Sequence, residues 1–175
     1  CNCIPSANAL VSIAHPINLN TSISLVKLAL LSGGVLTNSS GTLTITNILT
    51  TSGDGRFRAS TPWNIQDLSL SGTGSSAFTG GSLVTINGDV NIGPGTTLSR
   101  SSSDLTFNGS VTIDGTLDLG TTIGSFSGLG ATLDGNGSIT GNGTVSFTNN
   151  KTIIDSAALN IYPTLSISSN ATVSN

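Results

Sequence analysis

Apolar and polar residues alternate in short runs along most of the chain, and turns separate the runs. Val84–Gly93, which reads Val-Thr-Ile-Asn-Gly-Asp-Val-Asn-Ile-Gly, contains two such runs around one Asn-Gly pair. Leu105–Asp114 repeats this arrangement 21 positions later, with five of its ten positions identical. Alternation of period two puts apolar side chains on one face of a strand and polar side chains on the other. The pattern therefore predicts a chain of short β-strands.

The spacing of these runs distinguishes two arrangements of the strands. Asn-Gly between alternating runs is a strong hairpin signal, and at Asn108-Gly109 we expect a bend because both residues tolerate positive φ. A sandwich of antiparallel hairpins does not need one register repeated about every 20 residues, whereas a solenoid does, because each coil stacks on the previous one. We therefore predict an all-β fold, a right-handed parallel β-solenoid of about eight coils with essentially no helix.

One solenoid domain is expected to take up residues 1–175. We expect the first coils in 1–40, the regular repeats in 41–119 and the last coils in 144–175. The segment 120–143 is rich in Gly and is predicted to form either tight corners or a loop that leaves the rod. The residues predicted to lie in the interior are Val84, Ile86, Val90, Ile92, Leu105, Phe107, Val111, Ile113, Leu117 and Leu119.

Composition narrows the class of protein further. Only 7% of the residues are charged, and the eight acidic residues are all Asp, so the residues that build exposed helix faces are scarce. The chain is 36% hydrophobic with a net charge of −3, which favours a folded chain over a disordered one. Five scattered basic residues argue against nucleic-acid binding. No apolar run approaches the roughly 18 residues of a transmembrane segment.

The N-terminal part of the chain resembles a known group of proteins. Cys3-Ile-Pro-Ser6 and then Val11–Leu19 are similar to the first coil of strand-repeat regions in large secreted cell-surface proteins of the Bacteroidetes type, and Leu28–Leu36 resembles their following coil. The resemblance spans most of the chain and implies an exported β-solenoid of an adhesin or fibre. Asn8 and Ala9 stand where these regions carry an acidic residue, which argues against ion binding there.

Pattern and resemblance together predict a secreted, extracellular or cell-surface protein. We expect a structural or adhesive module that stacks head to tail into a fibre or forms part of a long surface stalk. Neither Cys1–Pro5 nor Leu165–Val173 has the pattern of a cap, and the open edge of a sheet presents unpaired N–H and C=O groups. The expected partner is therefore another copy of the chain, joined through the terminal coils, with surface glycans as a further candidate. No cofactor and no metal are expected.

The alternative is a β-solenoid module that binds glycans or ice. Thr42, Thr44 and Thr46 alternate as a flat ice-binding array requires. We expect the following coils to place Asp67 and Ser69 beside them, which would interrupt the array. Trp63 is either a residue of the core or a platform on which a sugar ring stacks.

A polysaccharide-degrading β-helix enzyme is a less favoured alternative, and we predict no enzyme. Such an enzyme needs clustered carboxylates, and Asp89, Asp114 and Asp118 are the closest grouping. Asp also hydrogen-bonds locally to backbone at turns, so capping is the preferred interpretation of all three. Asp134-Gly-Asn136 offers too few oxygens for Ca²⁺. His15, the only histidine, is predicted to point inward from the first coil.

Several residues are candidates for covalent modification. Cys1 and Cys3 can form a disulfide, carry a lipid anchor or remain unmodified. Asp155-Ser156-Ala157 fits a short pattern of bacterial O-glycosylation at Ser156. Seven Asn-x-Ser/Thr sequons are expected mostly from the abundance of these residues; they begin at Asn20, Asn38, Asn108, Asn136, Asn142, Asn150 and Asn170.

Overall fold

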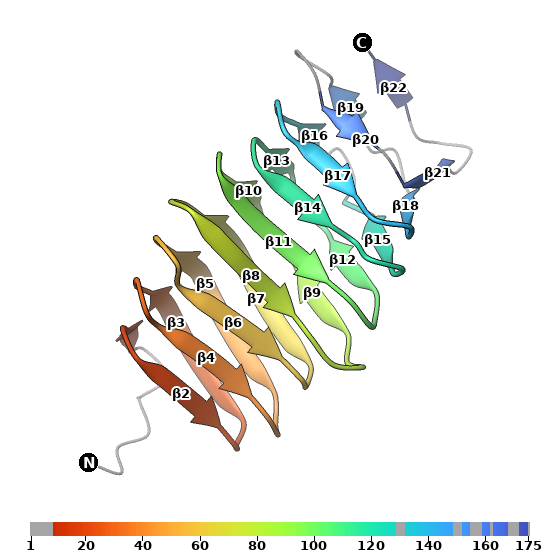
Figure 1. Ribbon diagram of the computed structural model, residues 1–175. Helices are drawn as coiled ribbons and strands as arrows, with labels where there is room; N and C mark the ends of the chain where they lie inside the picture. Colours follow the sequence, from red (N-terminus) through yellow and green to blue (C-terminus); the bar gives the residue numbers. More distant parts are fainter. Residues whose placement is uncertain are drawn as a thin grey trace.

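The chain forms a rod of stacked β-coils. The computed structural model describes residues 9–128, 132–148, 152–154, 159–161, 163–167 and 172–174. In this part of the chain every regular element is a strand, and the paired strands run parallel from coil to coil (Figure 1). The predicted parallel β-solenoid is therefore confirmed, with about seven turns.

The coils near the N-terminus contain two strands each. One strand of each coil belongs to a 14-stranded sheet and the other to an 8-stranded sheet. The strands are, in coil 1, β1 (Leu10–Ile13) and β2 (Pro16–Leu19); in coil 2, β3 (Ile23–Leu30) and β4 (Val35–Asn38); in coil 3, β5 (Leu43–Thr51) and β6 (Arg56–Ala59); in coil 4, β7 (Trp63–Leu70) and β8 (Gly74–Phe78).

From coil 5 onward two short strands replace the long one. The first part of β7 pairs with β9 and its second part pairs with β10, so the 14-stranded sheet forks there. The strands are, in coil 5, β9 (Val84–Ile86), β10 (Val90–Ile92) and β11 (Thr96–Arg100); in coil 6, β12 (Leu105–Phe107), β13 (Val111–Ile113) and β14 (Thr116–Asp118); in coil 7, β15 (Ile123–Phe126), β16 (Thr132–Asp134) and β17 (Ser138–Thr140); and beyond it β18 (Thr144–Phe147), β19 (Thr152–Ile154), β20 (Asn160–Ile161), β21 (Thr164–Ile167) and β22 (Thr172–Ser174).

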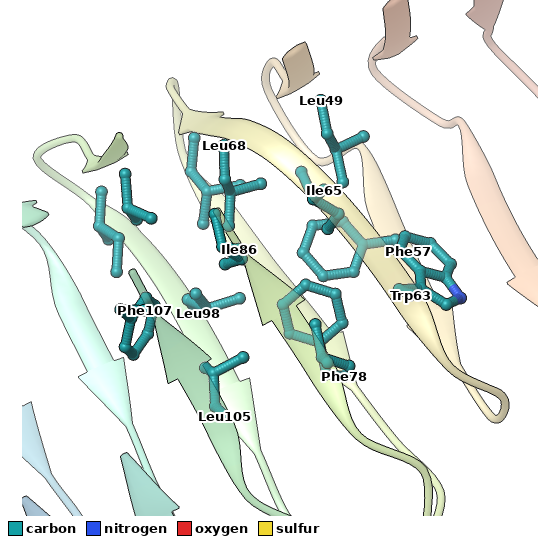
Figure 2. Close-up of a cluster of buried hydrophobic side chains, with 14 of the residues drawn as sticks. Leu49, Phe57, Trp63, Ile65, Leu68, Phe78, Ile86, Leu98, Leu105 and Phe107 are labelled. Atoms are coloured by element: carbon teal, nitrogen blue, oxygen red, sulfur yellow. The ribbon is translucent and has the colours of Figure 1, made fainter. Parts of the chain in front are cut away.

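Apolar side chains of successive coils stack into columns inside the rod, as Figure 2 shows for its central part. Leu105 pairs with Val84, and Val111 pairs with Val90. This is the predicted parallel register, since strands 84–86 and 105–107 lie directly beside each other. All ten residues predicted for the interior are at most 2% exposed. The alternating pattern therefore identified both the strands and the inward face.

Aromatic rings fill the widest parts of this interior. Phe107 and Phe126 stack with ring centroids 4.8 Å apart, and Phe147 continues the stack at 5.3 Å from Phe126. In coils 3 and 4, Trp63 meets Phe78 edge to face with centroids 5.7 Å apart (Figure 2). Trp63 is 0% exposed. It is therefore a core residue, which rules out the sugar-stacking platform considered for it.

The Asn-Gly corners have a different physical cause from the one predicted. Gly88 and Gly109 are not among the glycines with positive φ. A Cβ added to Gly109 would lie 2.1 Å from the carbonyl oxygen of Gly88 in the coil before it, which is far inside van der Waals contact. Glycine is needed at this corner because the backbones of neighbouring coils approach each other closely.

Two further expectations concern the Gly-rich segment and the histidine. Leu133 and Ile139 are buried in β16 and β17, and both strands stay in the two sheets. The described residues of 120–143 therefore continue the rod through tight corners and do not leave it. His15 is exposed in the bend between β1 and β2, so it is not the core residue that the alternation predicted, because the alternation does not cross the bend.

A charge placed in an inner column should unfold the rod. Val111→Asp is expected to lower the free energy of unfolding by several kcal/mol, because it buries an unpaired carboxylate among apolar side chains. The outward change Thr106→Asp on β12, where the residues paired with Thr106 are Thr85 and Ser125, serves as the control and should stay within about 0.5 kcal/mol of the wild type. Denaturant unfolding followed by circular dichroism measures both, and equal effects would contradict the assigned faces.

Candidate functional site

Carboxylates of the rod are used mainly to hold one coil on the next. Asp89 Oδ1 accepts a hydrogen bond from the backbone N–H of Ser110 at 3.1 Å, and Asp114 Oδ1 accepts one from Asn136 N–H at 3.0 Å. Asp118 Oδ1 accepts the N–H of Gly120 at 2.9 Å within its own turn. The capping interpretation of these three carboxylates is confirmed.

One corner carries a continuous series of such caps. Asp67 Oδ1 accepts the N–H of Asp89 at 3.0 Å, and Asp89 caps Ser110 in the following coil. The hydroxyl of Ser110 then accepts the N–H of Thr132 at 3.2 Å. Each side chain thus satisfies a backbone donor that the corner would otherwise leave without a strand partner. The sequence contains the signal for this series, since Asp67, Asp89 and Ser110 recur at nearly one coil spacing.

A second polar ladder lies in the same region. Asn108 Nδ2 donates to Asn87 Oδ1 at 3.1 Å, and Ser127 Oγ donates to Asn108 Oδ1 at 2.7 Å. The asparagines of the successive corners Asn87-Gly88 and Asn108-Gly109 are therefore paired with each other. This stacking explains why the same dipeptide recurs at the same place in the repeat.

The exposed corner of coil 3 contains Asp54, a carboxylate that accepts two hydrogen bonds from the coil before it. Asp54 Oδ1 accepts hydrogen bonds from Ser32 Oγ at 2.7 Å and from Gly33 N–H at 2.6 Å. These bonds, that of Ser32 most of all, hold the pKa of Asp54 below its ordinary value of 3.8. Arg56 adds a small effect in the same direction.

A buried cation joins two loops near the fork of the sheet. Arg100 is 1% exposed and is the charged member of the buried polar residues in the described part of the chain. Its guanidinium donates to three backbone carbonyls, those of Phe78 at 3.0 Å, of Ser103 and of Ser82. Burial lowers the pKa of Arg100, and the charge of Asp104 partly opposes this shift. Because its three acceptors are carbonyls at the end of β8 and in the two loops that contain Ser82 and Ser103, Arg100 anchors these loops.

An axial groove runs along the outside of the long sheet between two columns of outward side chains. In the first column, register places Ile48 between Lys27 and Asp67. In the second column, it places Ser69 between Thr50 and Asn91. The column nearer the corner consists of Leu10, Lys27, Ile48, Asp67, Asp89 and Ser110, and the other column of Ser12, Ala29, Thr50, Ser69, Asn91 and Thr112.

The axial groove contains two hollows that meet at one residue. The hollow over coils 3 to 6 has a volume of about 330 Å³ and is lined by both carboxylates of the corner series, Asp67 and Asp89, together with Asn91 and Thr112. A second hollow of about 270 Å³ lies over coils 1 to 3. Ile48 lines both, so the two hollows adjoin there and follow one line along the rod axis. Sequence reasoning missed it because only register shows which outward residues are neighbours.

The other predicted site residues do not join this groove. Neither Asp114 nor Asp118 lines it, so the grouping of these two with Asp89 is not found there. Thr44 stacks between Ser24 and Asn64 and not beside Asp67, which corrects the register assumed for the threonine array. Within the described residues no group of three or more His, Cys, Asp or Glu side chains could hold a metal ion.

The glycosylation candidates differ in accessibility. Asn38 is 0% exposed and its Nδ2 donates to Thr61 Oγ1 at 2.6 Å, so the folded chain cannot accept a glycan there. Asn20, Asn136 and Asn142 are exposed, and Asn108 is half-buried within the asparagine ladder. The remaining candidates lie outside the described residues: Cys1, Cys3, Asn150, Ser156 and Asn170.

Comparison with family models, with curated proteins and with solved structures gives no match for this chain. The repeat architecture implied by the resemblance to strand-repeat regions is confirmed by the coils themselves. The assignment to secreted proteins of the Bacteroidetes type still rests on the sequence pattern. Among the described residues there is no helix with the length and apolar character to cross a membrane.

The carboxylate of Asp54 should titrate below the range of an ordinary aspartate. Because its folded pKa is lowered, it stabilises the rod above pH 3.8, and this contribution disappears as pH falls through the lowered value. Carboxyl NMR titration should give a pKa below 3.8 for the wild type and a higher one for Ser32→Ala, which removes the strongest donor. A wild-type value at or above 3.8 would contradict the two hydrogen bonds.

Arginine should be required at position 100 and dispensable at an exposed position. Arg100→Lys is expected to reduce the free energy of unfolding by about 1–3 kcal/mol, because one ammonium group cannot reproduce the planar set of donors that reaches three carbonyls. Arg58→Lys, on the exposed face of β6, is the matched control and should change it by less than about 0.5 kcal/mol. Denaturant unfolding of both variants provides the measurement.

Proposed function

We propose that the chain is an extracellular structural and adhesive module whose terminal coils stack on further coils, either of another copy or of a longer stalk. The proposed role is non-enzymatic. The observation that carries the proposal is an uncovered end of the inner columns at coil 1. Ile17 is 44% exposed although its register partner Leu36, one coil further on, is 0% exposed. A coil placed against β2 would bury Ile17 as its own neighbours are buried.

The backbone of coil 1 supports the same joint. Among the described strands, β1 pairs only with β3, and β2 pairs only with β4. The carbonyls of Ile13 and Leu19 accept hydrogen bonds from coil 2, and in a strand the N–H and C=O of one residue point to the same side. The alternate residues Ser12 and Asn18 therefore direct their backbone groups away from coil 2. Edges of this kind are templates for another strand.

The opposite end of the rod offers a matching edge. β20, β21 and β22 each pair with one strand only among those described. Both ends therefore present parallel strands of the same rod, and a joint between unlike ends does not close on itself. Such heterologous contacts produce filaments.

Exposed charges are distributed unevenly along the axis, but they contribute little to this joint. In the described residues, the exposed cations Lys27, Arg56 and Arg58 all lie in coils 2 and 3. All described carboxylates except Asp54 lie from coil 4 onward: Asp67, Asp89, Asp104, Asp114, Asp118 and Asp134. Coils are about 4.8 Å apart and charges are screened within about 8 Å at physiological salt. Strand pairing and apolar contact therefore dominate, and the charges favour only the head-to-tail orientation.

An uncharged residue 17 should be required for assembly. Purified wild-type chain is expected to form rods or filaments whose length increases with concentration. Ile17→Lys should remain monomeric, because stacking would bury an unpaired ammonium group, and its melting temperature should stay near that of the wild type. Asn18→Lys puts the same charge on the outward face of β2 and should still assemble.

Electron microscopy and size-exclusion chromatography of the three proteins provide the measurement. A wild-type chain that stays monomeric at high concentration would contradict stacking between copies. Equal assembly of Ile17→Lys and wild type would place the contact elsewhere on the rod.

A further inference from the structure

We propose that the axial groove binds a linear, neutral polysaccharide along the rod without cleaving it. The larger hollow lies over coils 3 to 6 on the side of the rod, away from the strands at its ends, and only the smaller hollow reaches β1. Binding in the larger hollow therefore goes beyond the proposed assembly and does not depend on it. The axial groove extends over several coils, since its two hollows lie over coils 1 to 3 and coils 3 to 6 and share Ile48 as a lining residue.

The shape of the groove selects a linear polymer. Its walls are two columns of side chains that repeat once per coil, about 4.8 Å apart along the axis. Its width is the separation of residues i and i+2 of one strand, such as Ser110 and Thr112. One extended chain can lie lengthwise over such walls, and an extended chain of pyranose rings advances along its axis by a similar distance per ring. Successive rings can thus meet equivalent side chains on successive coils.

Polar groups of the groove suit sugar hydroxyls. Asp67 and Asp89 each use Oδ1 to cap a backbone N–H, and no described residue donates to either Oδ2. These oxygens can accept hydrogen bonds from hydroxyl groups of a ligand, and bonds to charged acceptors are the strong ones. Asn91 lies beside Thr112 on the wall opposite these carboxylates. Its side-chain amide both donates and accepts hydrogen bonds. The adjoining hollow contains Ala29 and Ile48, which can contact the C–H faces of the rings.

Charge and burial exclude other occupants. Asp67 and Asp89 line the larger hollow and Lys27 lines the smaller one. The two carboxylates outweigh this one cation and repel acidic polysaccharides, which favours a neutral chain. A basic strand of a second copy, such as β6 with Arg56 and Arg58, has complementary charge, but its paired backbone lies in the wall of another rod and cannot enter a groove one residue wide.

The test measures retention in gels that contain neutral linear polysaccharides, namely β-1,4-glucan, β-1,3-glucan, mannan and xylan in soluble form, with polygalacturonate as the acidic comparison. The protein carries Ile17→Lys, so that assembly does not affect migration, and wild type is run beside it. We expect retardation by at least one neutral polymer and none by polygalacturonate. The double variant Asp67→Asn/Asp89→Asn, which keeps both backbone caps because Asn also accepts, should bind about tenfold more weakly, and Asn91→Ala similarly.

The matched control is Asp118→Asn on the 8-stranded sheet, which should bind like the parent. Equal retention of the groove variants and the parent would overturn the proposal, as would the absence of retention by all four neutral polymers. Release of new reducing ends that Asp89→Asn abolishes would overturn it in favour of an active site. A salt-sensitive association of the parent protein that the groove variants lose would assign the groove to a second copy. Because Ile17→Lys blocks the joint in every arm, failure of the groove leaves the stacking proposal to its own test.

Discussion

Parallel pairing of each coil with the next, in constant register, is the interaction on which the rest of this rod depends. Register places Val84 beside Leu105 and Val90 beside Val111, so inward apolar residues of these strands meet other apolar residues one coil away. A shift by one residue would turn each inward column outward, because side chains alternate with period two. The same register also aligns the outward residues, so surface chemistry repeats along the axis.

At the corners, stacking requires both a close approach of neighbouring backbones and side-chain acceptors for backbone N–H groups. Backbones approach so closely at Gly109 that no Cβ fits, and polar side chains satisfy the donors that strands do not. The asparagine ladder of Asn87 and Asn108 and the carboxylate series that begins at Asp67 perform this task in neighbouring positions. Asp67, Asp89 and Asp114 thus take part in stacking, because each carboxylate accepts a backbone N–H group from the next coil.

Two side chains, those of Asp67 and Asp89, serve both the corner hydrogen bonds and the axial groove. Asp67 and Asp89 fix the coils with one oxygen each and present the other to the axial groove. A surface so constructed is rigid, since its walls are ordered by the backbone hydrogen bonds that build the fold. Preordered polar groups lose little entropy when they bind a ligand, which suits a shallow groove that lacks aromatic platforms. The ends of the rod have the opposite character, because Ile17 and the edges of β1 and β2 need a partner to be covered.

The sequence by itself determined the strands, their inward faces and the parallel stacking, because alternation such as Val111-Thr112-Ile113 and its recurrence after one coil are local signals. It also indicated that Asp89 and Asp114 cap turns, since Asp forms such bonds wherever backbone donors are near. Tertiary structure alone decided the rest. The exposure of His15 depends on a bend that interrupts the alternation, and the burial of Asn38 depends on the coils around it. Most of all, the axial groove depends on which outward residues become neighbours, and the neighbour of Thr44 proved to be Asn64. Coil lengths differ by a residue or two, and such small differences accumulate along the chain, so only the folded rod fixes which side chains share a surface.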